Sequence, residues 1–136
     1  MPFDLSIVTP QGEAYRGPVE SVVLPGSEGD FGVLPRHERF LTALRVGAIR
    51  IETGSDTLWA AVAAGFADVT GDAVVVLVES CELAHEIDTV QAQLAKEQAE
   101  QGLREHGDDP DDARIARFEA AIEHAQTRLS VSERQS

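Results

Sequence analysis

The stretch from Gly26 to Leu41, which reads GSEGDFGVLPRHERFL, carries the strongest structural signal in the chain. Three glycines, Gly26, Gly29 and Gly32, recur at a spacing of three residues with acidic residues between them. Glycine lets the backbone adopt positive φ or approach another surface closely. The stretch then passes through an apolar segment to Pro35, which is expected to end a strand. The regular spacing of the glycines and the proline at the end predict a loop of fixed shape.

Glycine-rich segments also occur in phosphate-binding loops, so that function has to be weighed for this stretch. The segment lacks the Gly-Lys-Ser/Thr ending of a P-loop, and the carboxylates of Glu28 and Asp30 would repel a phosphate group. Two interpretations remain open. The stretch is either a series of tight β-turns or a docking loop for a partner.

The overall composition is that of an ordinary globular protein. A chain of 136 residues predicts one or two small domains, and its 43% hydrophobic and 26% charged residues suit a buried core of moderate size. The formal net charge is -13, from 24 acidic and 11 basic residues. Such an acidic chain is a poor partner for nucleic acid or for anionic lipid.

Cysteine content and hydropathy indicate the cellular compartment of the chain and how it could reach a membrane. Cys81 is the only cysteine, which favours a reducing compartment and predicts a small buried hydrophobic residue. The first four residues lack the basic and apolar regions of a signal peptide. The longest apolar run, at residues 73–78, is far shorter than the ~20 residues of a membrane helix. We therefore expect a soluble chain that reaches a membrane only through a partner.

Residues 1–84 show the pattern of an all-β sandwich or barrel. Glycine-bearing turns recur about every ten residues, and Phe3, Leu5 and Ile7 alternate with polar residues as in a half-buried strand. A turn at Gly17-Pro18 is expected to precede a strand over residues 19–24. Further strands are predicted over residues 48–53, 58–63, 66–70 and 73–78. The last of these has no polar alternation, which predicts burial on both faces.

Residues 85–136 switch to a helical period and predict an antiparallel two-helix hairpin. Asp88 is a suitable N-cap, with Gln91 at the third position of a capping box. This first helix should end near Glu105, before a glycine. Asp109 can cap the second helix, with Pro110 in its first turn.

The hairpin carries stripes of apolar and of small side chains. Small faces let two helices approach closely but bury little area, so we expect a hairpin that is formed but weakly held. The predicted small-residue stripes are Ala92, Ala95, Ala99 and Gly102 on the first helix and Ala113, Ala116 and Ala120 on the second. The predicted apolar stripe on the second helix is Ile115, Phe118, Ile122, Ala125 and Leu129.

No arrangement of residues indicates an active site or a metal site. Glu82, Glu86 and Asp88 precede a helix, where acids are more often caps than catalysts. The acidic run 108–112 lacks the ordered ligands of an EF-hand. No serine lies in a nucleophile elbow. The four histidines lack metal-ligand spacing; they are His37, His85, His106 and His124.

Taken together, these features resemble the epsilon subunit of F-type ATP synthases over essentially the whole chain. The most specific match is the segment 26–35, followed by His37 and the segment 41–44. The segments 47–51 and 64–69 and the pair Ile87-Asp88 also match. In three places the chain departs from the family pattern. Ala64 replaces a glycine, and Arg36 and Arg39 flank His37 where the family usually has a small residue and a proline.

The resemblance implies a non-catalytic subunit of the central stalk, without a cofactor. Such a subunit sits with the gamma subunit above the ring of c subunits and couples ring rotation to gamma, and so to ATP synthesis. By residue-wise match, Asp30 falls where the family meets the c-ring. Thr9, His37 and Thr42 fall on the face that meets gamma.

The resemblance also implies a regulatory hairpin that lies folded on the sandwich or extends into the alpha/beta catalytic head and inhibits ATP hydrolysis. Some bacterial members bind ATP between the folded helices. Of the positions involved here, Glu82 and Asp88 match and Arg128 remains, while three others carry no arginine: Gln91, Gln98 and His124. Glutamine cannot replace the bidentate contacts of arginine with phosphate, so ATP binding should be very weak or absent.

A proton-translocating complex at the bacterial inner (plasma) membrane is the expected setting, with the chain peripheral on the cytoplasmic side. The alternative is a free-standing β-sandwich adaptor that binds another partner through the same glycine-rich stretch. An enzyme is the third hypothesis, and the sequence offers it neither a nucleophile nor paired carboxylates.

Overall fold

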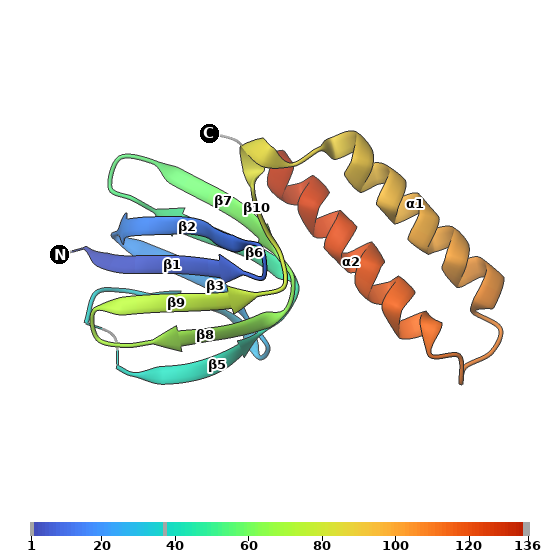
Figure 1. The fold of residues 1–136 in the computed structure, drawn as a ribbon, viewed down its shortest axis with the longest axis horizontal. Coiled ribbons are helices and arrows are strands. Elements are labelled where there is room, and N and C mark those ends of the chain that lie inside the picture. The colour runs from blue at the N-terminus through green and yellow to red at the C-terminus, as the bar shows by residue number, and fades with distance from the viewer. Residues whose placement is uncertain (1, 37, 135–136) are drawn as a thin grey trace.

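The computed structural model describes residues 2–36 and 38–134, which form a β-sandwich followed by two antiparallel helices (Figure 1). The predicted fold class is therefore confirmed. The strands are β1 (Phe3–Thr9), β2 (Gly12–Val19), β3 (Ser21–Gly26), β4 (Gly29–Val33), β5 (Phe40–Leu44), β6 (Gly47–Glu52), β7 (Thr57–Val62), β8 (Gly65–Val69), β9 (Ala73–Val78) and β10 (Cys81–Leu83). The short 3-10 helix η1 (Ala84–Glu86) leads into α1 (Thr89–His106) and α2 (Arg114–Ser132).

Nine strands follow one another in the order β10-β7-β6-β3-β5-β8-β9-β1-β2, and β4 pairs with β3 beside this path. All neighbours are antiparallel except β1 and β9, which are parallel. The link between β3 and β5 is a single pair, Gly26 opposite Leu44. β2 and β10, at the two ends of the order, also lie against each other. The sandwich is therefore nearly closed.

The core lies between the two layers and is built from the inward residues of alternating strands. Leu5, Ile7, Leu24, Ile49 and Ile51 are fully buried there. Burying each such side chain contributes about 1.5–3 kcal/mol. Because the side-chain period of a strand is two, this set fixes which residues of each strand face outward.

The glycine-rich stretch forms the β3–β4 hairpin. Gly26 pairs with Gly29 across a tight turn, and Gly29 has a φ of 134°, which favours glycine. A Cβ at Gly26 would lie only 2.7 Å from the Gly29 carbonyl oxygen and 2.8 Å from the Phe31 ring. The predicted fixed shape thus rests on close backbone packing at a turn. Arg36 adopts a φ of 64° shortly after β4, at one of the positions where the sequence departs from the pattern that it resembles.

The turn predicted at Gly17-Pro18 is wrong. Both residues lie inside β2, with Pro18 opposite Asp4 of β1. β2 ends the strand order, so proline is placed on an edge strand, where a missing ladder donor is tolerated. The chain turns instead at Glu20, immediately before β3.

The prediction that residues 73–78 are buried on both faces is also wrong. Val74 and Val76 are buried, whereas Val75 is 36% and Leu77 is 51% exposed. The strand alternates like its neighbours, because one of its faces meets the core and the other is open. What the sequence lacks is polar residues on that open face.

At the start of α1 the predicted N-cap is confirmed, but the predicted capping box does not form. Asp88 accepts a hydrogen bond from the Gln91 backbone N–H at 3.0 Å, as predicted. The Gln91 side chain does not return to Asp88. Its Oε1 instead accepts a hydrogen bond from Arg128 Nη1 at 2.5 Å.

The second helix begins later than predicted. Residues 109–112 form a turn, in which the Asp112 N–H donates to the Asp109 carbonyl at 3.1 Å. Asp112 then accepts from the backbone N–H of Arg114 at 2.9 Å and pairs with its guanidinium at 2.8 Å. Its side-chain hydrogen bond to Arg114 is the main cause that lowers the pKa of Asp112 to about 2. Asp109 is thus not the cap of α2: its carboxylate accepts from the Asp111 N–H within the turn, and Asp112 contacts the first helical residue.

Only one of the two predicted small-residue stripes lies between the helices. On α1, Ala92 and Ala99 are buried, and a Cβ at Gly102 would lie 2.5 Å from the Phe118 ring. On α2, Ala116 and Ala120 are exposed, as is Ala113 before the helix, so that second stripe was wrong. The larger side chains face α1 instead, and they leave the alanines on the solvent side. This apolar stripe is half-buried or buried throughout: Ile115, Phe118, Ile122, Ala125 and Leu129.

Gly65 should tolerate no side chain. A Cβ there would lie 1.9 Å from the Leu77 carbonyl oxygen and 2.8 Å from the Val78 Cα, both of them backbone atoms. We expect Gly65→Ala to lower the free energy of unfolding by about 3 kcal/mol, at the upper end of overpacking costs. Thermal denaturation should show a melting temperature lower by about 10 °C. The matched control is Gly32→Ala, whose Cβ would meet nothing within 4 Å. Equal melting temperatures for the two variants would contradict the prediction.

Candidate docking surfaces

An apolar face covers the outer side of β5, β8 and β9. Leu41 is 70%, Phe66 is 55% and Leu77 is 51% exposed. Residues directly opposite each other in an antiparallel sheet share a face, and Phe66 lies opposite both Ala43 and Leu77. Leu41 and Val75 flank Asp68 in the adjacent row. We call this surface the apolar face: Leu41, Ala43, Phe66, Val75 and Leu77.

A shallow groove of about 390 Å³ lies at one end of the apolar face. Phe66 and Leu77 form part of its wall, and Thr9 and Pro10 at the end of β1 form another part. The Thr9 hydroxyl accepts a hydrogen bond from the Gln11 N–H at 3.1 Å. Thr9 thus stabilises the β1–β2 turn at the edge of the groove.

The three positions predicted to meet gamma lie in different environments. Thr9 borders the groove beside Phe66. Thr42 is half-buried opposite Ala67, which is fully buried, so its side chain lies on the inner face of the sheet. His37 lies outside the described residues. Sequence reasoning missed Phe66 and Leu77, although the unbroken apolar run of β9 was the available signal.

The position predicted to meet the c-ring lies on the β3–β4 hairpin. Asp30 is on β4 opposite Pro25, and its carboxylate forms an ion pair with Arg45. The two side chains are 58% and 44% exposed, so solvent screens the pair and it contributes little stability. The hairpin therefore presents a solvated acid that a partner can reach.

The helical hairpin meets the sandwich through the second half of α2. Val131 is 1% exposed and forms a small cluster with Ala61, Ala84 and Ile87. Burying one valine contributes about 1.5–3 kcal/mol. Figure 1 shows both helices extending away from the sandwich beyond this junction. The hairpin is thus anchored at one end.

Three of the predicted nucleotide-site positions lie together in the polar part of the same junction: Glu82, Gln91 and Arg128. Arg128 is 9% exposed, and its Nε donates to Glu82 Oε1 at 2.6 Å while Nη2 donates to Glu82 Oε2 at 3.2 Å. Gln91 accepts from the third nitrogen. The guanidinium is therefore satisfied by the chain itself, and its charge is neutralised by Glu82.

The other three predicted positions contribute less. His124, one turn before Arg128, lies 3.4 Å from the Ser80 hydroxyl through Nε2. Burial lowers the pKa of His124, the Arg128 charge lowers it further, and Glu82 opposes this, so the ring is neutral near pH 7. Asp88 is occupied as the α1 cap, and Gln98 is exposed on α1.

Cys81 is half-buried on β10 and is not a candidate nucleophile. Burial raises the pKa of its thiol to about 12, and the charges of Glu86 and Glu82 add to this effect. Across residues 2–36 and 38–134, no three side chains of His, Cys, Asp or Glu gather in a way that would hold a metal ion. Neither described helix has the length and apolar character needed to span a membrane.

Two family descriptions match consecutive parts of the chain. The beta-sandwich domain of the ATP synthase delta/epsilon chain matches residues 2–84, and the long alpha-helix domain of the same chain matches residues 85–133. The fold also resembles a chain of the Euglena gracilis mitochondrial ATP synthase structure that contains OSCP, F1 and the c-ring. That similarity has a TM-score of 0.79 at 24% identity, and covers 97% of this chain and 81% of the other.

Curated relatives cover nearly the whole length on both sides. The ATP synthase epsilon chain of Syntrophobacter fumaroxidans is 41% identical over 130 residues, which are 96% of this chain and 95% of the relative. The ATP synthase epsilon chain of Desulforamulus reducens is 37% identical, with 95% and 96% covered. On the strength of both domain matches and these full-length relatives, the chain belongs to the ATP synthase delta/epsilon family.

Proposed function

We propose that this chain is the non-catalytic epsilon subunit of the central stalk in a proton-translocating F-type ATP synthase. Its sandwich couples the c-ring to gamma, and its helical hairpin restrains ATP hydrolysis. The observation that carries the docking role is the apolar face, together with the names of the full-length relatives. Monomeric proteins rarely expose large contiguous apolar patches unless the patch binds a partner.

The apolar face is the proposed gamma-binding surface. Thr9 lies at its edge. His37 and Thr42 stay proposed gamma-facing positions on the resemblance alone, and the Thr42 side chain lies on the inner face of the sheet, away from the apolar face. Asp30, on the separate β3–β4 hairpin, is the proposed contact with the c-ring. The chain would then lie peripherally at the cytoplasmic side of the plasma membrane, attached only through the complex.

Phe66→Asp should abolish co-purification with gamma. The substitution places a carboxylate in the middle of the apolar face, and its desolvation in an interface costs more than the lost ring contact alone. Pull-down of gamma by tagged full-length chain measures the effect, with a loss of at least tenfold expected. Val90→Asp is the matched control, because Val90 is 78% exposed on α1, outside the face. Retention of gamma by Phe66→Asp at the Val90→Asp level would contradict the assignment.

The hairpin is the proposed regulatory element, which extends toward the alpha/beta head when it leaves the sandwich. Its anchoring at one end supports this role, since little surface has to be separated to release it. In the assembled complex, a chain ending before Asp88 should raise the ATP hydrolysis rate by severalfold while ATP-driven proton pumping persists. An unchanged rate would remove the inhibitory role and leave coupling intact.

ATP should bind the isolated chain only weakly, with a dissociation constant above the micromolar range. Arg128 already donates all its described hydrogen bonds to Glu82 and Gln91, and a phosphate group would have to displace them. Isothermal titration calorimetry with Mg-ATP measures this affinity. The comparison variant is Gln91→Arg with Gln98→Arg, which restores two cations and should bind more tightly. Micromolar binding by the unmodified chain would contradict the expectation.

A further inference from the structure

Three side chains at the C-terminal end of the hairpin, spaced three residues apart, anchor it to the sandwich. Arg128 is paired with Glu82, Val131 is buried against Ala61, and Arg134 lies in the turn just beyond the C-cap of α2. Residues three apart share a helix face, so Arg128 and Val131 lie in one row on α2, and Arg134 follows them in the turn after the helix. Arg128 and Val131 are buried, whereas Arg134 is exposed. The junction therefore has an inner end and an outer end.

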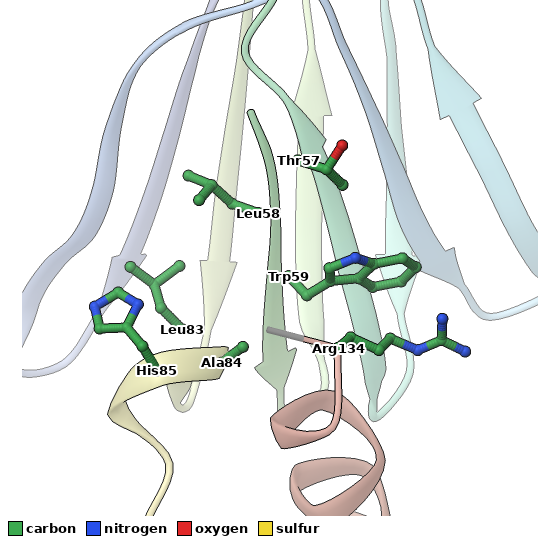
Figure 2. A pocket seen from close by; sticks show the side chains of 7 residues that line it. All are labelled: Thr57, Leu58, Trp59, Leu83, Ala84, His85 and Arg134. Atoms are coloured by element: carbon green, nitrogen blue, oxygen red, sulfur yellow. The ribbon is translucent and has the colours of Figure 1, made fainter. Parts of the chain in front are cut away.

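Arg134 makes its contact with the only tryptophan of the chain. Its guanidinium carbon lies 4.5 Å from the centroid of the Trp59 ring, within the range of a cation–π interaction. Figure 2 shows the Arg134 side chain running alongside the indole, at the edge of a small pocket that Leu83 and His85 also line. Trp59 belongs to β7, and Arg134 belongs to the hairpin.

A second arginine contacts the same ring from within the sandwich. Arg50 of β6 lies opposite Trp59 in the strand register, with its guanidinium carbon 5.9 Å from the ring centroid. Arg50 also forms an ion pair with Glu52 at 2.7 Å. Arg50 and Trp59 thus stay together whether the hairpin is docked or not, and the pair presents a preformed aromatic platform.

We propose that Trp59 and Arg134 form a clasp that closes the folded hairpin onto the sandwich, and that release of the hairpin starts by opening this clasp. The inference deepens the regulatory role proposed above and rests on it for its consequence in the complex. The exposed outer contact opens first, because water can solvate the guanidinium as it leaves the ring. The buried Val131 and the Arg128–Glu82 pair then separate in turn.

Arg134→Ala tests the clasp in the full-length isolated chain. Trp59 reports directly, because it is the only tryptophan. Loss of a cation–π contact should raise the undocked population about three- to tenfold. We expect faster quenching of Trp59 fluorescence by acrylamide, a neutral quencher, and faster amide exchange in α1 and α2 with unchanged exchange in the sandwich.

Arg117→Ala is the matched control, since it removes the same charge from an exposed position of α2. It should behave as the unmodified chain does. Trp59→Leu provides a second variant, read by amide exchange alone, and should loosen the hairpin like Arg134→Ala. The proposal is wrong if two results are found together. One is that Arg134→Ala matches the Arg117→Ala control in both Trp59 quenching and amide exchange of the hairpin. The other is that Trp59→Leu matches that control in amide exchange.

ATP hydrolysis by the assembled complex separates this inference from the regulatory role. With Arg134→Ala, a hairpin that is released more often should lower the hydrolysis rate. If Arg134→Ala loosens the isolated hairpin while hydrolysis stays unchanged, the clasp stands and the inhibitory role fails. If the truncation before Asp88 raises hydrolysis while Arg134→Ala leaves the isolated hairpin unaltered, the regulatory role stands and the clasp fails.

Discussion

The close approach of β8 to β9 at Gly65 sets the register on which the outer surface depends. Because Gly65 has no Cβ, the backbone of Leu77 passes directly over it, and Phe66 is then opposite Leu77. The same register turns Ala67 and Val76 into the core. A shift by one residue would exchange the two faces, burying the apolar surface and exposing the core residues. One backbone contact thus secures both stability and the proposed docking face.

The two parts of the chain are held by interactions of very different extent. The sandwich has one continuous core, whereas the hairpin meets it through a buried valine, a partly buried ion pair, an aromatic contact and the His124–Ser80 contact. The Arg128–Glu82 ion pair adds little net stability, because taking its charges partly out of water offsets much of their attraction. The pair does require one specific arrangement of the two side chains. The junction therefore specifies the folded position more strongly than it stabilises it.

The sequence allowed the fold class, the Asp88 cap and the α1 stripe to be predicted, because each follows from local periodicity or capping. It misplaced the turn at Gly17-Pro18, since only the tertiary fold makes β2 an edge strand that accepts proline. The glutamate partner of Arg128 was among the predicted site residues, but their pairing joins positions 46 apart. Trp59 and Arg134 come together only when α2 docks. No local pattern signals that contact.

The parallel pairing of β1 with β9 has a consequence for how the chain is made. β1 begins at Phe3, but one of its two neighbours ends at Val78, so one edge of β1 stays unpaired until more than half of the polypeptide has left the ribosome. Pairing that is so distant in sequence closes late and slowly. Until then the hairpins formed by β1–β2, β3–β4 and β6–β7 are the units that can fold locally. The helices leave the ribosome last, shortly after the final strands of the sandwich have become available for pairing.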